Sequence, residues 1–182
     1  MSLSRSRVSL AALSVFAVVA SEACRPNVVG GRSATANLVD TAGRSVGTLT
    51  LREASGGSLR IDGQMRGLPA GAHGIHFHAV GRCDAAGAFA SAGAHFNPAS
   101  RKHGLESAEG PHAGDLPNLA IGADGTGSFR TNTTRVTLGS DAASLLDADG
   151  SAVVVHAAPD DQRTDPSGNS GARIACGVIS AR

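Results

Sequence analysis

Val46-Gly-Thr-Leu-Thr-Leu-Arg-Glu53 alternates in polarity, with Leu49 and Leu51 on one face and polar side chains on the other. A period of two residues is typical of a β-strand that buries one face. Similar short stretches, separated by Gly-rich turns, recur along the chain. Short strands with frequent turns predict an all-β fold, an antiparallel barrel or sandwich. Eight strands are predicted, at Ala34–Val39, Val46–Glu53, Leu59–Met65, Gly74–Ala79, Leu119–Gly122, Ser128–Thr137, Ala152–Ala157 and Ile174–Ile179.

Two long segments interrupt this rhythm of strands and turns, Gly81–Pro117 and Pro159–Arg173. Long connections without secondary structure of their own are usually functional in a compact domain. Most of the histidines of the chain lie in or beside these two segments. We therefore expect a site built from loops on a rigid barrel.

Length and charge restrict the class of protein. The 182 residues fit one domain plus a short leader, and the net charge is +1. No cluster of basic residues is present that could follow a phosphate backbone. Nucleic acid is therefore not an expected partner.

The N-terminus has the pattern of an export signal. Arg5 and Arg7 precede the uncharged apolar run Val8–Ala20, and small residues at Ala20–Ala23 offer a cleavage site. The apolar run is too short to span a bilayer comfortably. The alternative is a buried N-terminal helix, but the polar stretch after it has nothing to pack against. We expect residues 1–23 to be a signal peptide, 24–33 a flexible linker and 34–182 the folded domain. The protein is then exported to the periplasm or cell envelope.

Three cysteines are present, Cys24, Cys83 and Cys176. In an oxidising compartment Cys83 and Cys176 can pair. Cys24 follows the apolar run at the place where a bacterial lipoprotein carries its lipidated cysteine, although Ser21-Glu22-Ala23 is a poor form of that cleavage motif. Cys24 is either a lipid anchor or a free cysteine in the tail.

Histidines form one ordered series in the chain, and histidine is the commonest metal ligand among side chains. His76 and His78 alternate with Phe77 on a predicted strand, so both imidazoles point to the same face. His156 ends a neighbouring predicted strand, and His95 opens the segment His-Phe-Asn-Pro98. Four imidazoles suit copper better than the hard cations, which prefer oxygen. We predict a copper site at His76, His78, His95 and His156.

A second group consists of His103, His112 and Asp115. Three ligands are one fewer than a closed zinc site requires. The fourth ligand is available if His95 is shared, because an imidazole that loses both protons can bind one ion through each nitrogen. We predict a zinc site at His95, His103, His112 and Asp115.

These motifs resemble the copper,zinc superoxide dismutase family, in particular its bacterial exported branch. The resemblance extends from about Ala34 to Ile179. The motifs that carry it are His76-Phe-His78 with Gly81 and Cys83, Gly-Ala-His-Phe-Asn-Pro98, Lys-His-Gly104, His-Ala-Gly-Asp-Leu116, Val-His156 and Gly-Ala-Arg-Ile-Ala-Cys-Gly-Val178.

The resemblance implies a Greek-key barrel and an enzyme that converts superoxide to O2 and H2O2 as copper cycles between Cu(II) and Cu(I). It implies that His95 takes part in proton transfer and that Arg173 docks the anion. It also implies a Cys83–Cys176 disulfide. Asp160 matches the carboxylate that orients histidines of both metals, although the adjacent Asp161 is an alternative.

Two further properties stay open in the sequence. The chain does not indicate whether it forms a homodimer. In the loop Pro159–Arg173, Pro166 and Ser167 stand where the eukaryotic branch has channel-lining lysine and threonine, so the guidance of superoxide cannot be transferred in detail. The alternative function is a non-enzymatic envelope protein of the same fold that binds copper or zinc.

Overall fold

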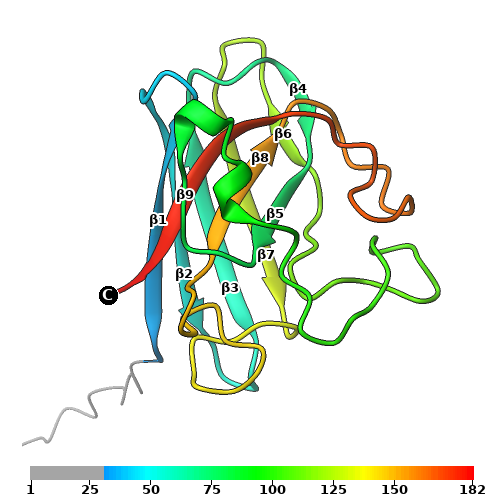
Figure 1. Ribbon diagram of the computed structural model, residues 1–182. Coiled ribbons are helices and arrows are strands. Elements are labelled where there is room, and N and C mark those ends of the chain that lie inside the picture. Colours follow the sequence, from blue (N-terminus) through cyan, green and yellow to red (C-terminus); the bar gives the residue numbers. More distant parts are fainter. Residues whose placement is uncertain (1–30) are drawn as a thin grey trace, which may run out of the picture.

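The computed structural model describes residues 31–182, and this part of the chain is almost entirely β-structure and loops (Figure 1). The all-β expectation is confirmed. Within the described residues there are nine strands and two short 3-10 helices, η1 and η2. They are β1 (Ser33–Asp40), β2 (Ser45–Glu53), β3 (Leu59–Met65), β4 (Gly71–His73), β5 (Ile75–His78), η1 (Ala85–Gly87), η2 (Ala90–Ala92), β6 (Leu119–Ile121), β7 (Gly127–Thr133), β8 (Ala152–His156) and β9 (Arg173–Ala181).

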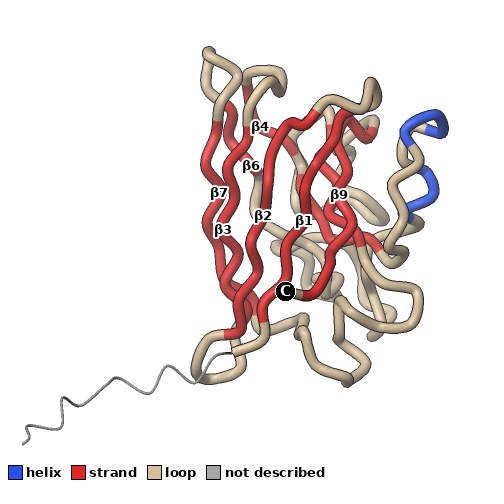
Figure 2. The backbone as a smooth tube through the Cα atoms, turned by 90° about the vertical axis from the view of Figure 1, so that its left-hand side faces the viewer, coloured by secondary structure: helices blue, strands red, loops and turns tan. Residues whose placement is uncertain are grey.

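A curled antiparallel sheet of seven strands, in the order β5-β8-β9-β1-β2-β3-β7, forms most of the barrel, and β4 pairs with β6 in a second small sheet. Several neighbours are far apart in the sequence, such as β5 with β8 and β3 with β7. Such crossovers are typical of Greek-key arrangements. Figure 2 shows η1 and η2 outside the sheet, on the side of β9.

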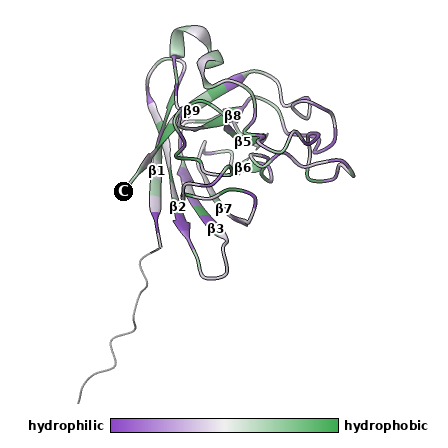
Figure 3. Cartoon of the chain, turned by 60° about the horizontal axis from the view of Figure 1, so that its bottom comes forward, coloured by the Kyte–Doolittle hydropathy of each residue, from purple (hydrophilic) through white to green (hydrophobic). Residues whose placement is uncertain are grey.

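Strands β1, β2 and β3 bury one face and expose the other. Their burial alternates along the strand, as in β3, where Leu59, Ile61 and Met65 are buried and Arg60 is exposed. The hydrophilic stretches on β2 and β3 contrast with the hydrophobic β8 in Figure 3. The inward side chains form the main core of the barrel. Burial of one face is what the alternating sequence predicted.

Strands β5 and β8 are buried along their whole length. Their inner side chains, among them Phe77 and Val153, belong to the main core. On their outer face, Ala152 and Val154 of β8 pack in a second apolar cluster with Phe89, Ala92 and Cys176. This face is covered by the long connections 79–118 and 157–172, which lie on this side of the barrel (Figure 1). This half of the barrel therefore has a protected outer face that can hold polar side chains.

The structure differs from the predicted strands at several ends, and β9, for example, continues to Ala181 beyond the predicted Ile179. The predicted strand Ser128–Thr137 ends at Thr133, and residues 71–73 form the short strand β4 that the sequence did not indicate. β1 begins at Ser33, inside the predicted linker. The predicted signal peptide and Cys24 lie outside the described residues. Among residues 31–182 no helix has the length and apolar character needed to cross a membrane.

Candidate metal centre

The outer face of β5 and β8 presents three histidines. His76 and His78 are opposite Val154 and Ala152 of β8, two members of the second apolar cluster. His156 pairs with Arg173 at the start of β9, next to an irregularity in the strand register. Side chains two residues apart in a strand point to one side. The three imidazoles consequently share the covered outer face.

The connection 79–118 is tied to β5 by backbone hydrogen bonds around Phe77. The Phe77 N–H donates to the Gly114 carbonyl at 2.9 Å, and the Phe77 carbonyl accepts from Phe96 N–H at 2.8 Å. A Cβ at Gly114 would lie 2.4 Å from the Phe77 carbonyl oxygen, so only glycine allows this approach. These bonds place His95, next to Phe96, and Asp115, next to Gly114, beside β5.

His76, His78, His95 and His156 form what we call the four-imidazole cluster. Their ligand atoms lie within 4.8 Å of one another. Among the described residues, His76 Nδ1 and the Nε2 atoms of the other three are buried without a hydrogen-bond partner. Buried polar atoms are nearly always paired, so four orphaned nitrogens in one place fit a bound metal ion.

The opposite nitrogens of three of these rings have acceptors. His78 Nδ1 donates to the Gly93 carbonyl at 2.9 Å, and His156 Nδ1 donates to the Gly171 carbonyl at 3.1 Å. His76 Nε2 donates to Asp160 Oδ2 at 2.7 Å. Because a carbonyl oxygen only accepts, the proton lies on that nitrogen and the lone pair on the other faces the cluster. The rings are oriented as metal ligands.

Burial keeps these imidazoles neutral. It lowers the pKa of His76 to about 4, against the opposing influence of Asp160. It lowers the pKa of His156 to about 3 and holds the pKa of His78 well below its ordinary value. At neutral pH their lone pairs are therefore available to a metal rather than occupied by protons.

His95, His103, His112 and Asp115 form a second group, which we call the carboxylate cluster. Asp115 Oδ1 lies 3.0, 3.1 and 3.3 Å from the Nδ1 atoms of His95, His103 and His112. Asp115 Oδ2 accepts from the backbone N–H of Gly104 and of His112. One carboxylate oxygen is thus held by the backbone while the other faces three imidazoles, a donor set that fits zinc.

His95 belongs to both clusters. Its Nδ1 faces Asp115, and its Nε2 is the unpartnered nitrogen in the four-imidazole cluster. The structure therefore brings the two predicted ligand sets together with one ring between them, each nitrogen directed to a different set.

Charge differs between the two clusters. Burial alone would lower the pKa of His103, but Asp115 and Asp160 outweigh it and raise the pKa to about 9. The same contacts hold the pKa of Asp115 far below its ordinary range, although burial opposes this. The carboxylate cluster consequently contains an ionised carboxylate, which the four-imidazole cluster lacks.

Asp160 connects the two clusters. Its Oδ2 accepts from His76 Nε2 and its Oδ1 lies 3.0 Å from His103 Nε2. Asn118 holds its backbone on both sides, since Asn118 Nδ2 donates to the Asp160 carbonyl and Asn118 Oδ1 accepts from the Asp160 N–H, both at 2.8 Å. Asp161, the alternative from the sequence, instead accepts from Arg163, Thr164 and Asn169 within its own loop.

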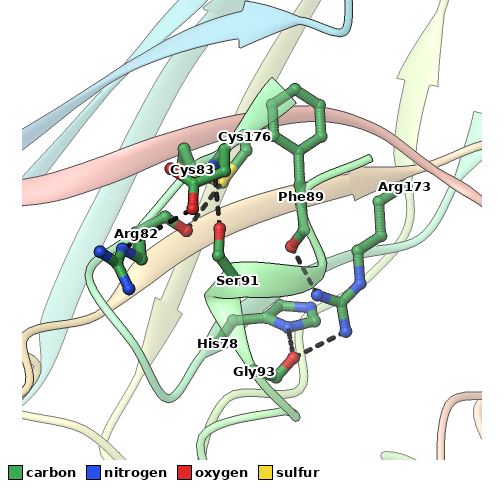
Figure 4. Close-up of a disulfide and its surroundings, with 9 residues drawn as sticks. His78, Arg82, Cys83, Phe89, Ser91, Gly93, Arg173 and Cys176 are labelled. Carbon is green, nitrogen blue, oxygen red and sulfur yellow. Dashed lines mark hydrogen bonds and ion pairs between the residues drawn. A yellow bond between two sulfur atoms is a disulfide. The ribbon is translucent and has the colours of Figure 1, made fainter. Parts of the chain in front are cut away.

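Arg173 lies beside the four-imidazole cluster, and the backbone of segment 79–95 holds its guanidinium. Nη1 donates to the Phe89 carbonyl at 2.7 Å and Nη2 to the Gly93 carbonyl at 2.6 Å (Figure 4). Burial lowers the pKa of Arg173 without removing its charge, because arginine ionises far above neutral pH.

Cys83 and Cys176 form a disulfide with Cα atoms 5.7 Å apart, as predicted (Figure 4). The bridge joins segment 79–95 to β9, which also carries Arg173. A sequence separation of 93 residues makes its contribution to stability about 4–5 kcal/mol in the chain-entropy model.

Three supporting groups were not among the predicted site residues. They are the Gly93 carbonyl, Asn118, and Arg135, whose Nη2 donates to the Asp115 carbonyl at 2.6 Å. Asn118 lies two residues after the motif His-Ala-Gly-Asp-Leu116, and this proximity was the available signal for it. The other two contacts join segments distant in sequence, for which no local pattern exists.

An antiparallel barrel with two histidine clusters around one shared imidazole defines a candidate bimetallic centre. The chain is also similar to known proteins. A family model described as copper/zinc superoxide dismutase matches residues 45–179. A protein named superoxide dismutase [Cu-Zn] from Caulobacter vibrioides is 43% identical over 150 residues, covering 81% of this chain and 85% of that protein. Another of that name, from Aquifex aeolicus, is 43% identical over 146 residues, covering 79% and 84%.

A solved structure of a superoxide dismutase-like protein from Bacillus subtilis matches with a TM-score of 0.77 and 40% identity, covering 80% of this chain and 97% of that one. The chain belongs to the copper/zinc superoxide dismutase family. The family resemblance of its sequence motifs is thereby confirmed, as are copper and zinc as the cofactors of the family.

Proposed function

We propose that the chain is a copper/zinc superoxide dismutase. It converts two superoxide ions and two protons into one O2 and one H2O2. The observation that carries the proposal is the convergence of four unpartnered, buried imidazole nitrogens beside the charged Arg173. His76, His78, His95 and His156 would hold copper. His95, His103, His112 and Asp115 would hold zinc.

Copper, when bound, would supply the one-electron redox chemistry that the conversion of superoxide to O2 and H2O2 needs and that no side chain of the site provides. Zinc has no redox activity, so the carboxylate cluster fixes the connection 79–118 and holds His95 Nδ1. His95 Nε2 is also the atom that can hold a proton, because no other group of the described residues pairs with it. It would carry that proton only while it is not holding copper. Asp160 keeps His76 and His103 in their tautomers.

Arg173 binds the substrate anion. Its contacts with Phe89 and Gly93 use one N–H of each terminal nitrogen, which leaves the second N–H of each for an oxygen of superoxide. Its guanidinium lies where burial weakens screening by water, so its attraction for a small anion is strong. The neutral imidazoles around it add no competing negative charge.

The test is the rate of superoxide removal by purified protein loaded with copper and zinc. We expect catalysis far above spontaneous dismutation, and Arg173→Ala should lower kcat/KM by about tenfold to a hundredfold without loss of either metal. Arg173→Lys should have a kcat/KM between those of the unaltered protein and Arg173→Ala, because a single ammonium cannot reproduce the forked contacts of the guanidinium. A loaded protein that removes superoxide no faster than buffer would overturn the proposal.

A non-enzymatic copper- or zinc-binding protein is the second candidate, favoured by a 40% identical relative that is named only as superoxide dismutase-like. The complete ligand sets and Arg173 argue for the enzyme. Metal analysis after growth with ample copper separates the two candidates. Zinc without copper, together with absent activity, would select the binding protein.

We further propose that the protein is exported to the periplasm or cell envelope, with residues 1–23 as signal peptide and 34–182 as the catalytic domain. The disulfide supports this, because such bridges persist in oxidising compartments. A lipid on Cys24 and a homodimer are parts of the proposal that rest on sequence alone. Mass spectrometry of the mature N-terminus and sedimentation of the purified protein test them. An uncleaved chain recovered from the cytoplasm would contradict export.

A further inference from the structure

The backbone that holds Arg173 has an unusual conformation at one of its two acceptors. Ala88 and Phe89 both adopt the left-handed region, with φ of 46° and 61°. This conformation is uncommon for residues other than glycine, and a bulky side chain makes it more so. It turns the Phe89 carbonyl toward Arg173 Nη1. A strained conformation persists only where surrounding contacts fix it.

Local hydrogen bonds at Phe89 do not attach it to the barrel. The Phe89 N–H donates to the Asp84 carbonyl and its carbonyl accepts from Ala92, so both bonds stay within the segment that contains η1 and η2. The disulfide holds the segment at Cys83, six residues before Phe89 and across η1. Neither contact joins Phe89 directly to β8 or β9, and the link through Ala92 reaches only the end of β5.

The side chain of Phe89 supplies that attachment. The ring is completely buried and lies in the apolar cluster with Ala152 and Val154 of β8 and Cys176 of β9. In Figure 4 the ring lies on the side of the disulfide while the carbonyl points the other way, to the guanidinium. Phe89 is therefore connected to the outer face of the sheet twice, by its ring through the apolar cluster and by its carbonyl through Arg173.

We propose that Phe89 is a positioning residue for Arg173. Its buried ring holds residues 88–89 in the left-handed conformation, and the carbonyl so placed fixes the guanidinium at the angle needed to receive an anion. That Arg173 receives a substrate anion rests on the proposed function, whereas the contact between Phe89 and Arg173 is part of the structure itself.

Gly93, the other acceptor of Arg173, is fixed independently. The Val80 N–H donates to the Ala92 carbonyl at 3.0 Å and the Ala79 N–H donates to the Ala94 carbonyl at 2.9 Å, which ties both neighbours of Gly93 to the end of β5. The Gly93 carbonyl also accepts from His78 Nδ1. Loss of the Phe89 ring should therefore loosen Arg173 while His78 and copper stay in place.

The experiment compares Phe89→Ala, Phe89→Leu and the matched control Phe129→Ala in the copper- and zinc-loaded protein. Phe129 is a buried ring in the main core on β7, away from Arg173. Azide serves as the anion probe, with its affinity read from the copper absorption spectrum. We expect Phe89→Ala to weaken azide binding by roughly fivefold, as fits a displaced charged donor, with unchanged copper content. Phe89→Leu should give a smaller loss, and Phe129→Ala none.

Two further measurements keep the test decisive. In the Arg173→Ala background the effect of Phe89→Ala on azide should vanish, because coupled residues are not additive. The guanidinium NMR signal of Arg173, recorded on zinc-loaded protein without copper, should show faster side-chain motion in both Phe89 variants. If Phe89→Ala does not fold, Phe89→Leu carries the same test. Unchanged azide affinity and an unchanged Arg173 signal, or an equal loss in the Arg173→Ala background, would overturn the proposal.

Failure of the proposed function is recognised separately. If the unaltered protein removes no superoxide, the dismutase assignment fails, whereas the Arg173 NMR signal still reports whether Phe89 positions the guanidinium.

Discussion

The four-imidazole cluster and the carboxylate cluster share His95 and are otherwise built differently. The first takes His76, His78 and His156 from strands, and burial lowers the pKa of these three rings, which keeps them neutral. The second takes its other ligands from the connection 79–118 and contains the ionised carboxylate of Asp115. Neutral ligands leave the charge of a metal ion uncompensated where Arg173 stands, which favours an anionic substrate. In the carboxylate cluster, Asp115 compensates the charge of a metal ion at a site that does not bind substrate.

The largest expected effect is on the strand-borne side. His156→Ala removes one of the imidazoles of the four-imidazole cluster and leaves the carboxylate cluster complete. Copper binding should be lost, superoxide removal should fall to the spontaneous rate, and zinc should remain. Metal analysis and a superoxide assay on the same sample check this. Retained activity with a full copper content would remove His156 from the ligand set.

The converse change is Asp115→Asn, which replaces the only carboxylate of the second cluster. Zinc affinity should fall by about a hundredfold or more, because a ligand and two backbone contacts are weakened together. Copper should still bind through four imidazoles. Competition with a zinc chelator measures the loss. Equal loss of both metals would mean that Asp115 supports both clusters rather than the carboxylate cluster alone.

Asp160→Asn tests the connection between the clusters. An amide has one acceptor oxygen and one donor nitrogen, so it cannot accept from both His76 and His103. Affinities for copper and zinc should each fall by about tenfold to a hundredfold. Asp161→Asn is the matched control, since Asp161 contacts only its own loop, and it should change metal affinity little.

A smaller effect concerns pH in metal-stripped protein. His76 and His156 have folded pKa values of about 4 and 3, below the ordinary 6.5, so protons bind the unfolded chain first as pH falls. The free energy of unfolding should therefore decrease from pH 6.5 to 4.5, by up to roughly 1.4 kcal/mol per pH unit for each such histidine. His103 behaves oppositely, because its raised pKa stabilises the fold below 6.5 and this contribution is lost as pH rises through about 9.

Denaturant unfolding at the two pH values measures this loss. His156→Gln should reduce it, by on the order of 1–2 kcal/mol over the window. Asp115 and Asp160 do not interfere, since their depressed pKa values place their loss at lower pH. An identical pH dependence in both proteins would contradict the burial of a neutral His156.

Strands with clear alternation were predictable, and so was the pairing of the disulfide, but weaker patterns misled. Val136 and Leu138 extend the apolar alternation beyond Thr133, yet they reach the core from a loop rather than from the sheet ladder. β4 has only three residues and begins at Gly71, with φ of 130°, so it has no period to detect.

In the site, spacing led to both ligand sets but not to their supports. Asp160 and Asp161 are adjacent and chemically identical in sequence, and only the fold directs Asp160 toward the two histidines. The carbonyls that hold Arg173 carry no side-chain signal, and their direction depends on the left-handed backbone at Phe89. Such contacts arise from tertiary packing, which local patterns do not encode.

The sharing of His95 between the two clusters is tested most directly by the spectrum of copper in the protein before and after zinc is added. If one imidazole serves both ions, zinc binding at Nδ1 changes the electron density at Nε2. One equivalent of zinc should then shift the visible absorption and the electron paramagnetic resonance signal of bound copper, and Asp115→Asn should suppress the shift at the same zinc concentration. Superimposable copper spectra with and without bound zinc would contradict a shared His95.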